Sequence, residues 1–286
     1  MQHLRIFIEL TRLNKPIGFM LLFWPCSWGL ALAYQYNQNL NQFIYFLLLF
    51  FLGSVLMRSA GCIFNDIVDK DIDKRVKRTK KRPIASGKIT VGKSFFYIII
   101  LCLTSLIILL QFNTLTILLG LFSMLLAFSY PFMKRITYWP QLFLGLTFNW
   151  GLVMAWTSFG NQITVDIGLL YLSAIFWTLG YDTIYGAQDI VDDEIIGNKS
   201  TAIKFKKKIK LFISLCYSFC LIPLVIVLYP KMKIDISLIL FFIFIASLIY
   251  QLKTFNKKKP LSCLKAFKFN NISGIFLFST IMSLNF

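Results

Sequence analysis

Residues 43–73 read FIYFLLLFFLGSVLMRSAGCIFNDIVDKDID, so a long apolar run ends directly in a cluster of carboxylates. The apolar part is long enough for one membrane-spanning helix, which needs roughly 20 residues. The segment that follows, Asn65 to Asp73, holds four aspartates within nine residues. This junction predicts a transmembrane helix with an unusually acidic end at the membrane surface.

Apolar runs of this kind recur along the whole chain. Of the 286 residues, 57% are apolar and 15% are charged, whereas about a quarter of the residues in a soluble domain are charged. A disordered chain, a collagen-like chain and a disulfide-rich secreted module are excluded, because they need an excess of polar residues, of Gly and Pro, and of Cys, respectively. We predict one all-α integral membrane domain over residues 1–286. Its nine predicted transmembrane helices lie at about 17–34, 43–64, 94–110, 115–131, 142–156, 167–180, 211–228, 236–252 and 269–286.

The net charge of +18 fits a membrane topology. With alternate connections assigned to opposite sides, 27 of the 30 Lys and Arg residues fall on the amino-terminal side and two on the other. Because basic residues concentrate in cytoplasmic loops, the amino terminus is predicted to be cytoplasmic and the carboxyl terminus outside. The high net charge is therefore explained by membrane orientation and by contacts of basic residues with lipid headgroups, and it does not indicate nucleic-acid binding. Richness in Ile, Phe, Lys and Asn favours a bacterial protein, so the inner membrane is expected.

Cysteine and histidine chemistry is not indicated. The six cysteines lie mostly inside the predicted helices, none forms a CxxC pair, and His3 is the single histidine. Zinc sites and histidine acid–base catalysis are therefore set aside.

A second acidic segment lies 120 positions after the first, as the spacing of Asp69 and Asp189 shows. The two segments hold nine of the twelve acidic residues: Asp66, Asp69, Asp71, Asp73, Asp182, Asp189, Asp192, Asp193 and Glu194. Each segment follows an even-numbered predicted helix and falls in a cytoplasmic loop, at about 64–93 and 181–210. This repetition suggests two four-helix halves followed by a ninth helix.

Helical spacing places the acids of each segment on one face. Asn65, Asp69 and Asp73 recur every four residues with Asp66 beside them, and Asp182, Asp189 and Asp193 are spaced by seven and four. Carboxylates so arranged repel one another unless a cation lies between them. Mg²⁺ suits such hard oxygen ligands and usually keeps substrate phosphates and water as further ligands. The implied ligand is a diphosphate; the alternative is solvated loop carboxylates paired with Lys70, Lys74 and Arg75.

Basic residues accompany both acidic segments. Arg78, Arg82 and Lys199 could neutralise phosphate oxygens and hold a leaving group. Arg58 lies deeper, seven residues before Asn65 on the same helical face, where a buried charge is costly and often functional. A carboxylate-bearing substrate would be a natural partner for it. The alternatives are that Arg58 reaches the cytoplasmic interface or pairs with Asp66.

The motif Asn65-Asp66-x-x-Asp69-x-x-x-Asp73 resembles the first signature of the UbiA superfamily of membrane prenyltransferases. Residues 181–183 with Asp189-x-x-x-Asp193 resemble the second. Within that superfamily the chain is most similar to the 4-hydroxybenzoate polyprenyltransferases of ubiquinone biosynthesis. The segments that carry this similarity lie in the first 200 residues or so, at 12–18, 57–62, 76–79, 130–135 and 181–202.

The resemblance implies nine helices around a central cavity and a Mg²⁺-dependent transferase. It implies that one Mg²⁺ is held by Asn65, Asp69 and Asp73, with Asp66 as a further candidate, and another by Asp189 and Asp193. It assigns the diphosphate to Arg78, Arg82, Tyr130 and Lys134, and the carboxylate of an aromatic acid to Arg58. Asp182 is a candidate proton acceptor. Asp71, Asp192 and Asn198 are departures from the family pattern.

The implied reaction transfers a polyprenyl group from a prenyl diphosphate to the ring carbon ortho to the hydroxyl of 4-hydroxybenzoate, with no obligate protein partner. Three alternatives stay open. A related prenyltransferase would act on a naphthoate, homogentisate, haem or chlorophyll acceptor. A phosphatidyl-alcohol transferase would carry characteristic DG and AR pairs within its acidic motif. Both pairs are missing here, since Ile67 follows Asp66 and Lys70 follows Asp69. A cation transporter would need carboxylates near mid-membrane rather than at helix ends.

Overall fold

The computed structural model describes residues 2–76 and 79–285, and all regular structure within these ranges is helical. The helices are α1 Gln2–Thr11, α2 Ile17–Asn37, α3 Leu40–Val68, α4 Lys70–Asp73, α5 Val91–Leu109, α6 Thr114–Ile136, α7 Pro140–Ser158, α8 Val165–Gly186, α9 Ile190–Ile196, α10 Thr201–Lys204, α11 Ile209–Leu228, the 3₁₀ turn η1 Tyr229–Lys231, α12 Ile236–Thr254 and α13 Pro260–Ser283. The prediction of an all-α chain is confirmed over the described residues.

Polar residues fix where several long helices begin. Side chains at the amino-terminal ends of five of them accept hydrogen bonds from the first turn: Asn39 for α3, Thr90 for α5, Asn113 for α6, Thr164 for α8 and Asp235 for α12. These bonds satisfy N–H groups that have no partner within the helix. The predicted apolar runs begin within three residues of these helices, because the same polar residues interrupt the hydropathy.

Among the described residues, seven helices are long and apolar enough to cross a membrane: α2, α3, α5, α6, α8, α12 and the combined segment Ile209–Lys231. The predicted runs at 142–156 and 269–286 fall in α7 and α13, which are not among the seven. The predicted count of nine spans is therefore not confirmed. The apolar helices form an integral membrane protein, and large apolar side chains on α5 and α6, such as Ile107 and Leu125, are exposed as lipid contact requires.

Buried amides lower the hydropathy of α7. Asn149 is fully buried, and its Nδ2 donates to Gly145 O at 2.7 Å, Ala174 O at 3.1 Å and Thr178 Oγ1 at 2.8 Å. Small polar groups of this kind join helices within a membrane bundle. The polar residues of α7 therefore face neighbouring helices, where they cost little even though they reduce its apolar character.

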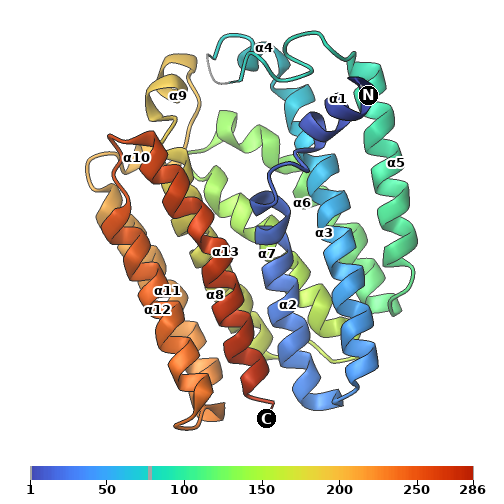
Figure 1. Ribbon diagram of the computed structural model, residues 1–286, viewed down its shortest axis with the longest axis vertical. Coiled ribbons are helices and arrows are strands. Elements are labelled where there is room, and N and C mark those ends of the chain that lie inside the picture. Colours follow the sequence, from blue (N-terminus) through green and yellow to red (C-terminus); the bar gives the residue numbers. More distant parts are fainter. Residues whose placement is uncertain (1, 77–78, 286) are drawn as a thin grey trace.

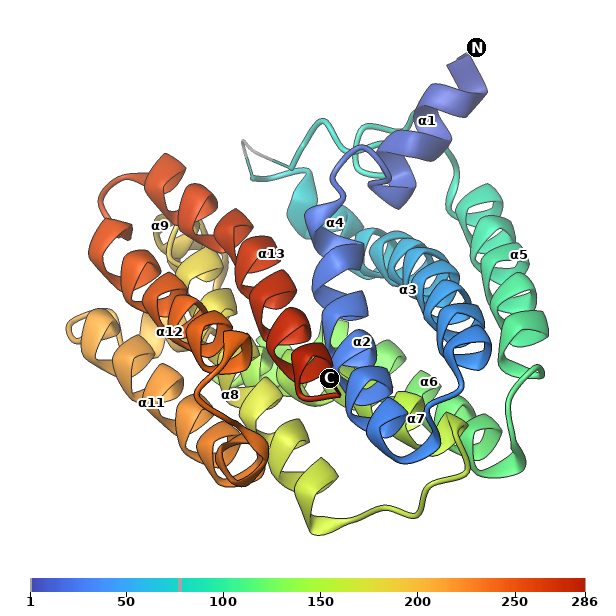
Figure 2. The ribbon, with the colours of Figure 1, turned by 60° about the horizontal axis from the view of Figure 1, so that its bottom comes forward.

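The helices form a ring in which α13 completes the circle (Figure 2). In chain order α2, α3, α5 and α6 form one side and α7, α8, α11 and α12 the other, while α13 packs against α12, α2 and α8. Trp24 Nε1 donates to Asn271 Oδ1 at 2.9 Å and Trp28 Nε1 to Gly274 O at 3.1 Å, which fastens α2 to α13. Gly29 lies against the backbone oxygen of Leu152, so α2 and α7 approach more closely than any side chain there would allow.

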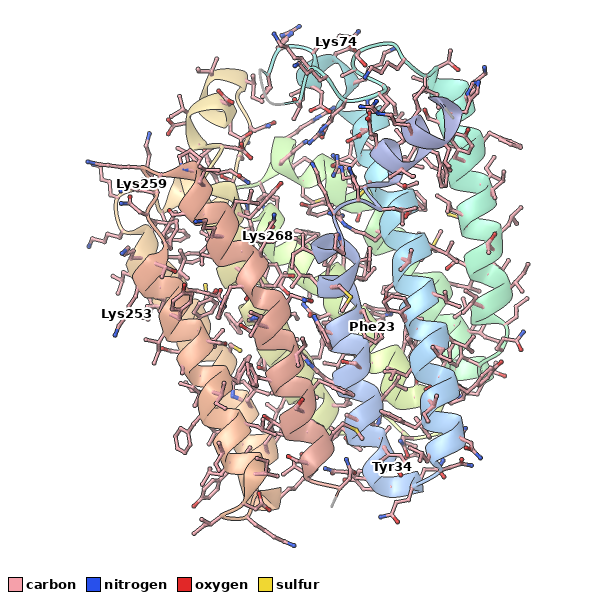
Figure 3. The ribbon with its side chains drawn as sticks, viewed as in Figure 1. Phe23, Tyr34, Lys74, Lys253, Lys259 and Lys268 are labelled. Atoms are coloured by element: carbon pink, nitrogen blue, oxygen red, sulfur yellow. The ribbon has the colours of Figure 1, made fainter. Side chains whose placement is uncertain are left out.

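The acidic segments gather at one end of the bundle. Figure 1 shows α1, α4 and α9 at the upper end and the carboxyl terminus at the lower end. In Figure 3 the labelled Lys74 and Lys259 lie toward the same upper end, whereas Tyr34 lies at the opposite end. The fold therefore brings both acidic segments, which are separated by more than 100 residues of chain, to a common surface.

Candidate active site

The two acidic segments have matching backbone geometry. α3 ends at Val68 and the short helix α4 begins at Lys70, with Asp69 at the junction. α8 ends at Gly186 and α9 begins at Ile190, with Asp189 immediately before it. The four-residue spacing predicted that the helix continues without a break through the first segment, but α3 and α4 are separate helices. Hydrogen bonds from Asp69 N to Asn65 O at 2.9 Å and from Asp73 N to Asp69 O at 2.8 Å nevertheless preserve the four-residue repeat.

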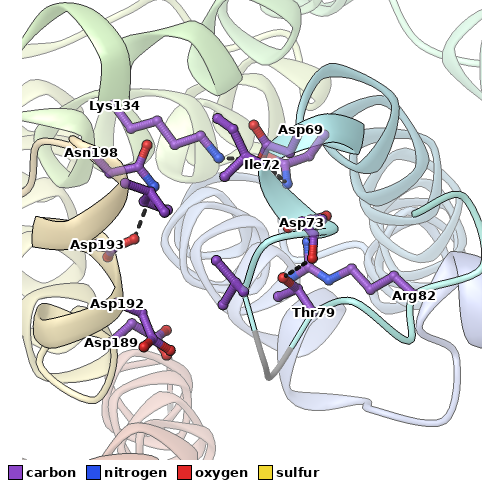
Figure 4. A pocket seen from close by; sticks show the side chains of 13 residues that line it. Asp69, Ile72, Asp73, Thr79, Arg82, Lys134, Asp189, Asp192, Asp193 and Asn198 are labelled. Carbon is purple, nitrogen blue, oxygen red and sulfur yellow. Dashed lines mark hydrogen bonds and ion pairs between the residues drawn. The ribbon is translucent and has the colours of Figure 1, made fainter. Parts of the chain in front are cut away.

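One pocket lies between these segments. Its lining comprises Asn65, Asp69, Ile72, Asp73, Val76, Thr79, Arg82, Lys134, Asp189, Asp192, Asp193, Ile196 and Asn198. Figure 4 shows Asp69, Asp73 and Arg82 on one side and Asp189 and Asp193 on the other. The structure thus brings together five predicted metal ligands and two of the predicted diphosphate-binding residues.

Cations from distant parts of the chain pair with Asp69. Its carboxylate forms an ion pair with Lys134 and a longer one with Arg135 at 3.4 Å, and it accepts a hydrogen bond from Asn65 Nδ2 at 3.1 Å. The alternative of solvated carboxylates paired with neighbouring lysines applies to Asp71, which is 82% exposed and lies 3.0 Å from Lys74 Nζ. It does not apply to Asp69, whose side chain is 2% exposed.

Arg82 joins the other two acids of the first segment. Its Nη1 lies 2.8 Å from Asp73 Oδ2 and 3.1 Å from Asp66 Oδ1. Burial raises the pKa of Asp73, with Arg82 acting in the opposite direction and the nearby carboxylates of Asp66 and Asp69 adding to the rise. A further positive charge nearby, such as a metal ion, would stabilise the ionised form of this carboxyl group.

The second segment is organised by its own loop. Asn198 donates from Nδ2 to Asp193 Oδ1 at 2.9 Å and from its backbone N to Asp193 O at 2.9 Å. Lys199 was predicted to bind phosphate, but it is not among the pocket-lining residues: its Nζ donates to Ile136 O at 3.1 Å and its backbone N to Lys134 O at 2.8 Å. These bonds fix the loop after α9 to the end of α6, next to Lys134.

The donor set fits Mg²⁺ in its usual mode of binding. Within residues 2–76 and 79–285, no three His, Cys, Asp or Glu side chains lie close enough to hold a metal ion by themselves. The pocket instead offers amide and carboxylate oxygens on two facing walls. Mg²⁺ commonly takes one or two carboxylates and completes its octahedral shell with water and phosphate oxygens. The walls are therefore suited to a metal ion that arrives with, or is shared with, a phosphate.

A second group of polar residues lies among the helices rather than in this pocket. The Arg58 guanidinium lies over the ring of Phe148, with Cζ 5.2 Å from the ring centroid. Its Nε is buried, and no hydrogen-bond partner for it occurs in the part of the chain that the structure describes. The alternative pairing of Arg58 with Asp66 is not observed, since Asp66 pairs with Arg12 and Arg82.

One predicted metal ligand, Asp66, does not line the pocket, and two cations that pair with the first acidic segment were not predicted. Arg78 lies outside the described residues. Asp66 is not among the lining residues, and its carboxylate accepts from Arg12 Nη2 at 2.5 Å. Arg12 and Arg135 carried no role in the sequence interpretation. The sequence feature that could have pointed to them is their position, because both lie in segments that resemble the family.

The fold and the site together define a helical integral membrane protein with an acidic, two-walled pocket at one end of its bundle. The chain belongs to the UbiA prenyltransferase family, whose model matches residues 22–275.

Relatives of established name share much of the sequence. A mitochondrial 4-hydroxybenzoate polyprenyltransferase from Arabidopsis thaliana is 49% identical over 214 residues, or 74% of this chain, which spans about half of that relative's length (52%). A 4-hydroxybenzoate octaprenyltransferase from Psychromonas ingrahamii is 40% identical over 277 residues, which cover 96% of this chain and 94% of the relative. The structure of a UbiA homologue from Archaeoglobus fulgidus bound to GPP and Mg²⁺ has the same fold, with a TM-score of 0.71 at 18% identity and coverage of 97% and 99%.

Proposed function

We propose that this protein transfers a polyprenyl group from a prenyl diphosphate to the ring carbon ortho to the hydroxyl of 4-hydroxybenzoate, in the Mg²⁺-dependent prenylation step of ubiquinone biosynthesis. The observation that carries the proposal is a pocket lined by aspartates of both acidic segments. The names of the Arabidopsis and Psychromonas relatives support the acceptor, and the homologue bound to GPP and Mg²⁺ supports the donor and the metal.

The pocket residues divide into metal ligands and phosphate ligands. Asn65, Asp69 and Asp73 would hold Mg²⁺ on one wall, and Asp189 and Asp193 on the other. Bound Mg²⁺ would supply positive charge that stabilises the departing diphosphate. Among the basic residues, Arg82 and Lys134 line the pocket and would contact the remaining phosphate oxygens, with Arg78 as a further candidate. Lys134 would exchange its partner Asp69 for phosphate when substrate binds.

The chemistry then follows from charge and from the exclusion of water. As the allylic C–O bond breaks, Arg82 and Lys134 stabilise the negative charge on the leaving group. The prenyl cation is attacked by the electron-rich ring carbon, and the surrounding helices keep water away. Arg58 would hold the carboxylate of the acceptor, which places Tyr130 and Asp182 near the ring. Asp182 is the candidate acceptor for the proton that the ring carbon loses.

We further propose nine membrane spans in one domain over residues 1–286, with the amino terminus in the cytoplasm of a bacterial cell and the carboxyl terminus outside. The shared pocket supports this topology. If α7 did not cross, the second acidic segment would lie on the opposite side of the membrane from the first.

Reporter fusions test this topology. Alkaline phosphatase fused after Lys258 should be inactive and the same enzyme fused after Phe286 active, because α13 separates the two points. Green fluorescent protein at the same positions should give the opposite pattern. Phosphatase activity at Lys258 would contradict the nine-span topology.

Purified protein in lipid nanodiscs provides the direct test of the reaction. With 4-hydroxybenzoate and a prenyl diphosphate, we expect a 3-prenylated acid in the presence of Mg²⁺ and a fall to background with excess EDTA. Restoring Mg²⁺ should restore the rate. Product formation only with another aromatic acceptor would move the protein to a sibling activity, and metal uptake into proteoliposomes without any product would favour a transporter.

A further inference from the structure

Four charged side chains form a cluster at the pocket wall, and two of them, Asp73 and Arg82, also line the pocket. Arg12 Nη2 lies 2.5 Å from Asp66 Oδ1, Arg82 Nη1 lies 3.1 Å from the same oxygen, and Arg82 Nη1 also lies 2.8 Å from Asp73 Oδ2. The aspartate side chains are 2% and 7% exposed and the arginines 25% and 22%. Two positive and two negative charges balance, so the group is neutral as a whole.

Arg12 reaches this cluster from an unusual backbone position. Its φ of +58° lies in the left-handed region, which residues other than glycine adopt uncommonly and which surrounding contacts must maintain. It lies between the end of α1 and the start of α2, where Lys15 N donates to Arg12 O at 2.9 Å. This geometry directs the side chain onto α3, where Nη1 also lies 3.7 Å from Cys62 Sγ.

Asp66 has a different environment from its neighbours in the motif. Asn65 and Asp69 line the pocket, whereas Asp66 does not and is enclosed by the two arginines. Both interactions that Arg82 makes in the cluster use Nη1. Within the described residues, Nη2 and Nε of the same guanidinium remain to face a phosphate. Arg82 therefore spans the boundary between the cluster and the pocket.

We infer that Arg12 and Asp66 are positioning residues for Arg82, and that Asp66 acts in this way rather than as a metal ligand. Asp66 fixes the guanidinium at the pocket edge, and Arg12 neutralises Asp66 so that Arg82 is not drawn away from the pocket. Without Arg12, Arg82 would be the one cation among the described residues that pairs with the two buried carboxylates, and a buried charge left without its partner is costly. This inference rests on the proposed diphosphate site.

Binding of inorganic pyrophosphate tests the inference without turnover. Titration calorimetry on the full-length protein in nanodiscs should show that Arg12→Gln weakens binding by about tenfold, whereas Arg12→Lys retains most of the affinity. Asp66→Asn keeps a side-chain oxygen that can accept from Arg82 while removing the negative charge that competes with phosphate. It should therefore bind pyrophosphate at least as tightly as the wild type, with or without Mg²⁺. The double variant Arg12→Gln/Asp66→Asn should return to within about threefold of wild type, because coupled residues are non-additive.

Arg5→Gln is a matched control, since Arg5 also lies on the amino-terminal segment but is 84% exposed and pairs with Glu9 at 3.2 Å. It should bind as the wild type does. Additive effects of Arg12→Gln and Asp66→Asn, or loss of Mg²⁺-dependent binding in Asp66→Asn, would overturn the inference. If Arg12→Gln does not fold, Arg12→Lys and Asp66→Asn still decide between the two roles. Absence of pyrophosphate binding in the wild type would instead overturn the diphosphate site, and this inference with it.

Discussion

Replacing Asp69 with alanine should lower the rate of prenyl transfer by at least about a thousandfold, on the scale of losing a principal electrostatic group of an active site. Asp69 is buried at the junction of α3 and α4, accepts a hydrogen bond from Asn65, and pairs with Lys134 and Arg135. Its removal takes away a proposed metal ligand and leaves the ammonium group of Lys134 without its carboxylate. Initial rates at saturating substrate in nanodiscs measure the loss.

Two variants separate chemistry from folding in this experiment. Asp71→Ala removes an acid from the same segment that is 82% exposed and whose ion pair within the described residues is with nearby Lys74, so its rate should stay near wild type. Asp69→Asn keeps the shape of the side chain while removing its charge, and it should be nearly as inactive as the alanine variant. All three should reach the membrane in normal amounts. A near-normal rate for either Asp69 variant would falsify the proposed two-metal assignment.

Replacing Arg58 with glutamine should raise the KM for 4-hydroxybenzoate by about 30-fold or more, because losing the partner of a desolvated charge costs about 2 kcal/mol or more. Arg58 lies over Phe148, and its buried Nε has no hydrogen-bond partner in the described residues, which leaves a donor for an acceptor carboxylate. The KM for prenyl diphosphate should change little, since Arg58 does not line the acidic pocket. Steady-state kinetics with each substrate varied in turn provide the measurement.

A phenol that lacks the carboxylate distinguishes recognition from general damage. Wild-type protein and Arg58→Gln should use such an acceptor with similar, low efficiency, because neither can gain from the missing carboxylate. Arg58→Lys should recover part of the lost affinity for 4-hydroxybenzoate, since an ammonium lacks the paired donors of the guanidinium. Equal losses with both acceptors would show that Arg58 supports the structure instead of reading the carboxylate.

Sequence patterns predicted the helices well, because the apolar residues that make a segment helical in a membrane lie within that segment. The apolar runs at 43–64 and 167–180 fall within α3 and α8, and both acidic segments follow the predicted helices directly. The patterns were less informative for α7, whose buried Asn149 donates from Nδ2 to Ala174 O and Thr178 Oγ1 of α8. Hydropathy cannot distinguish such satisfied polar groups from exposed ones, so the number of spans stays a prediction.

The residues of the candidate site were likewise predicted in part. Spacing alone indicated that Asn65, Asp69 and Asp73 share a face, and the pocket includes all three. Spacing did not separate Asp66 from that face, because its surroundings depend on Arg12, 54 residues earlier, and on Arg82. Lys199 was predicted to bind phosphate because it is a basic residue in the loop after the second acidic segment, whereas its Nζ donates to Ile136 O.

The sequence by itself determined that this chain is helical, lies in a membrane and carries two acidic segments suited to Mg²⁺ and a diphosphate. These properties follow from composition and short-range periodicity, which act within a single helix and its cap. Only the tertiary structure decided which cation meets which carboxylate, since Lys134 reaches Asp69 across 65 residues of chain. Such pairings are set by how the helices rotate and pack against one another, and no local pattern encodes that arrangement.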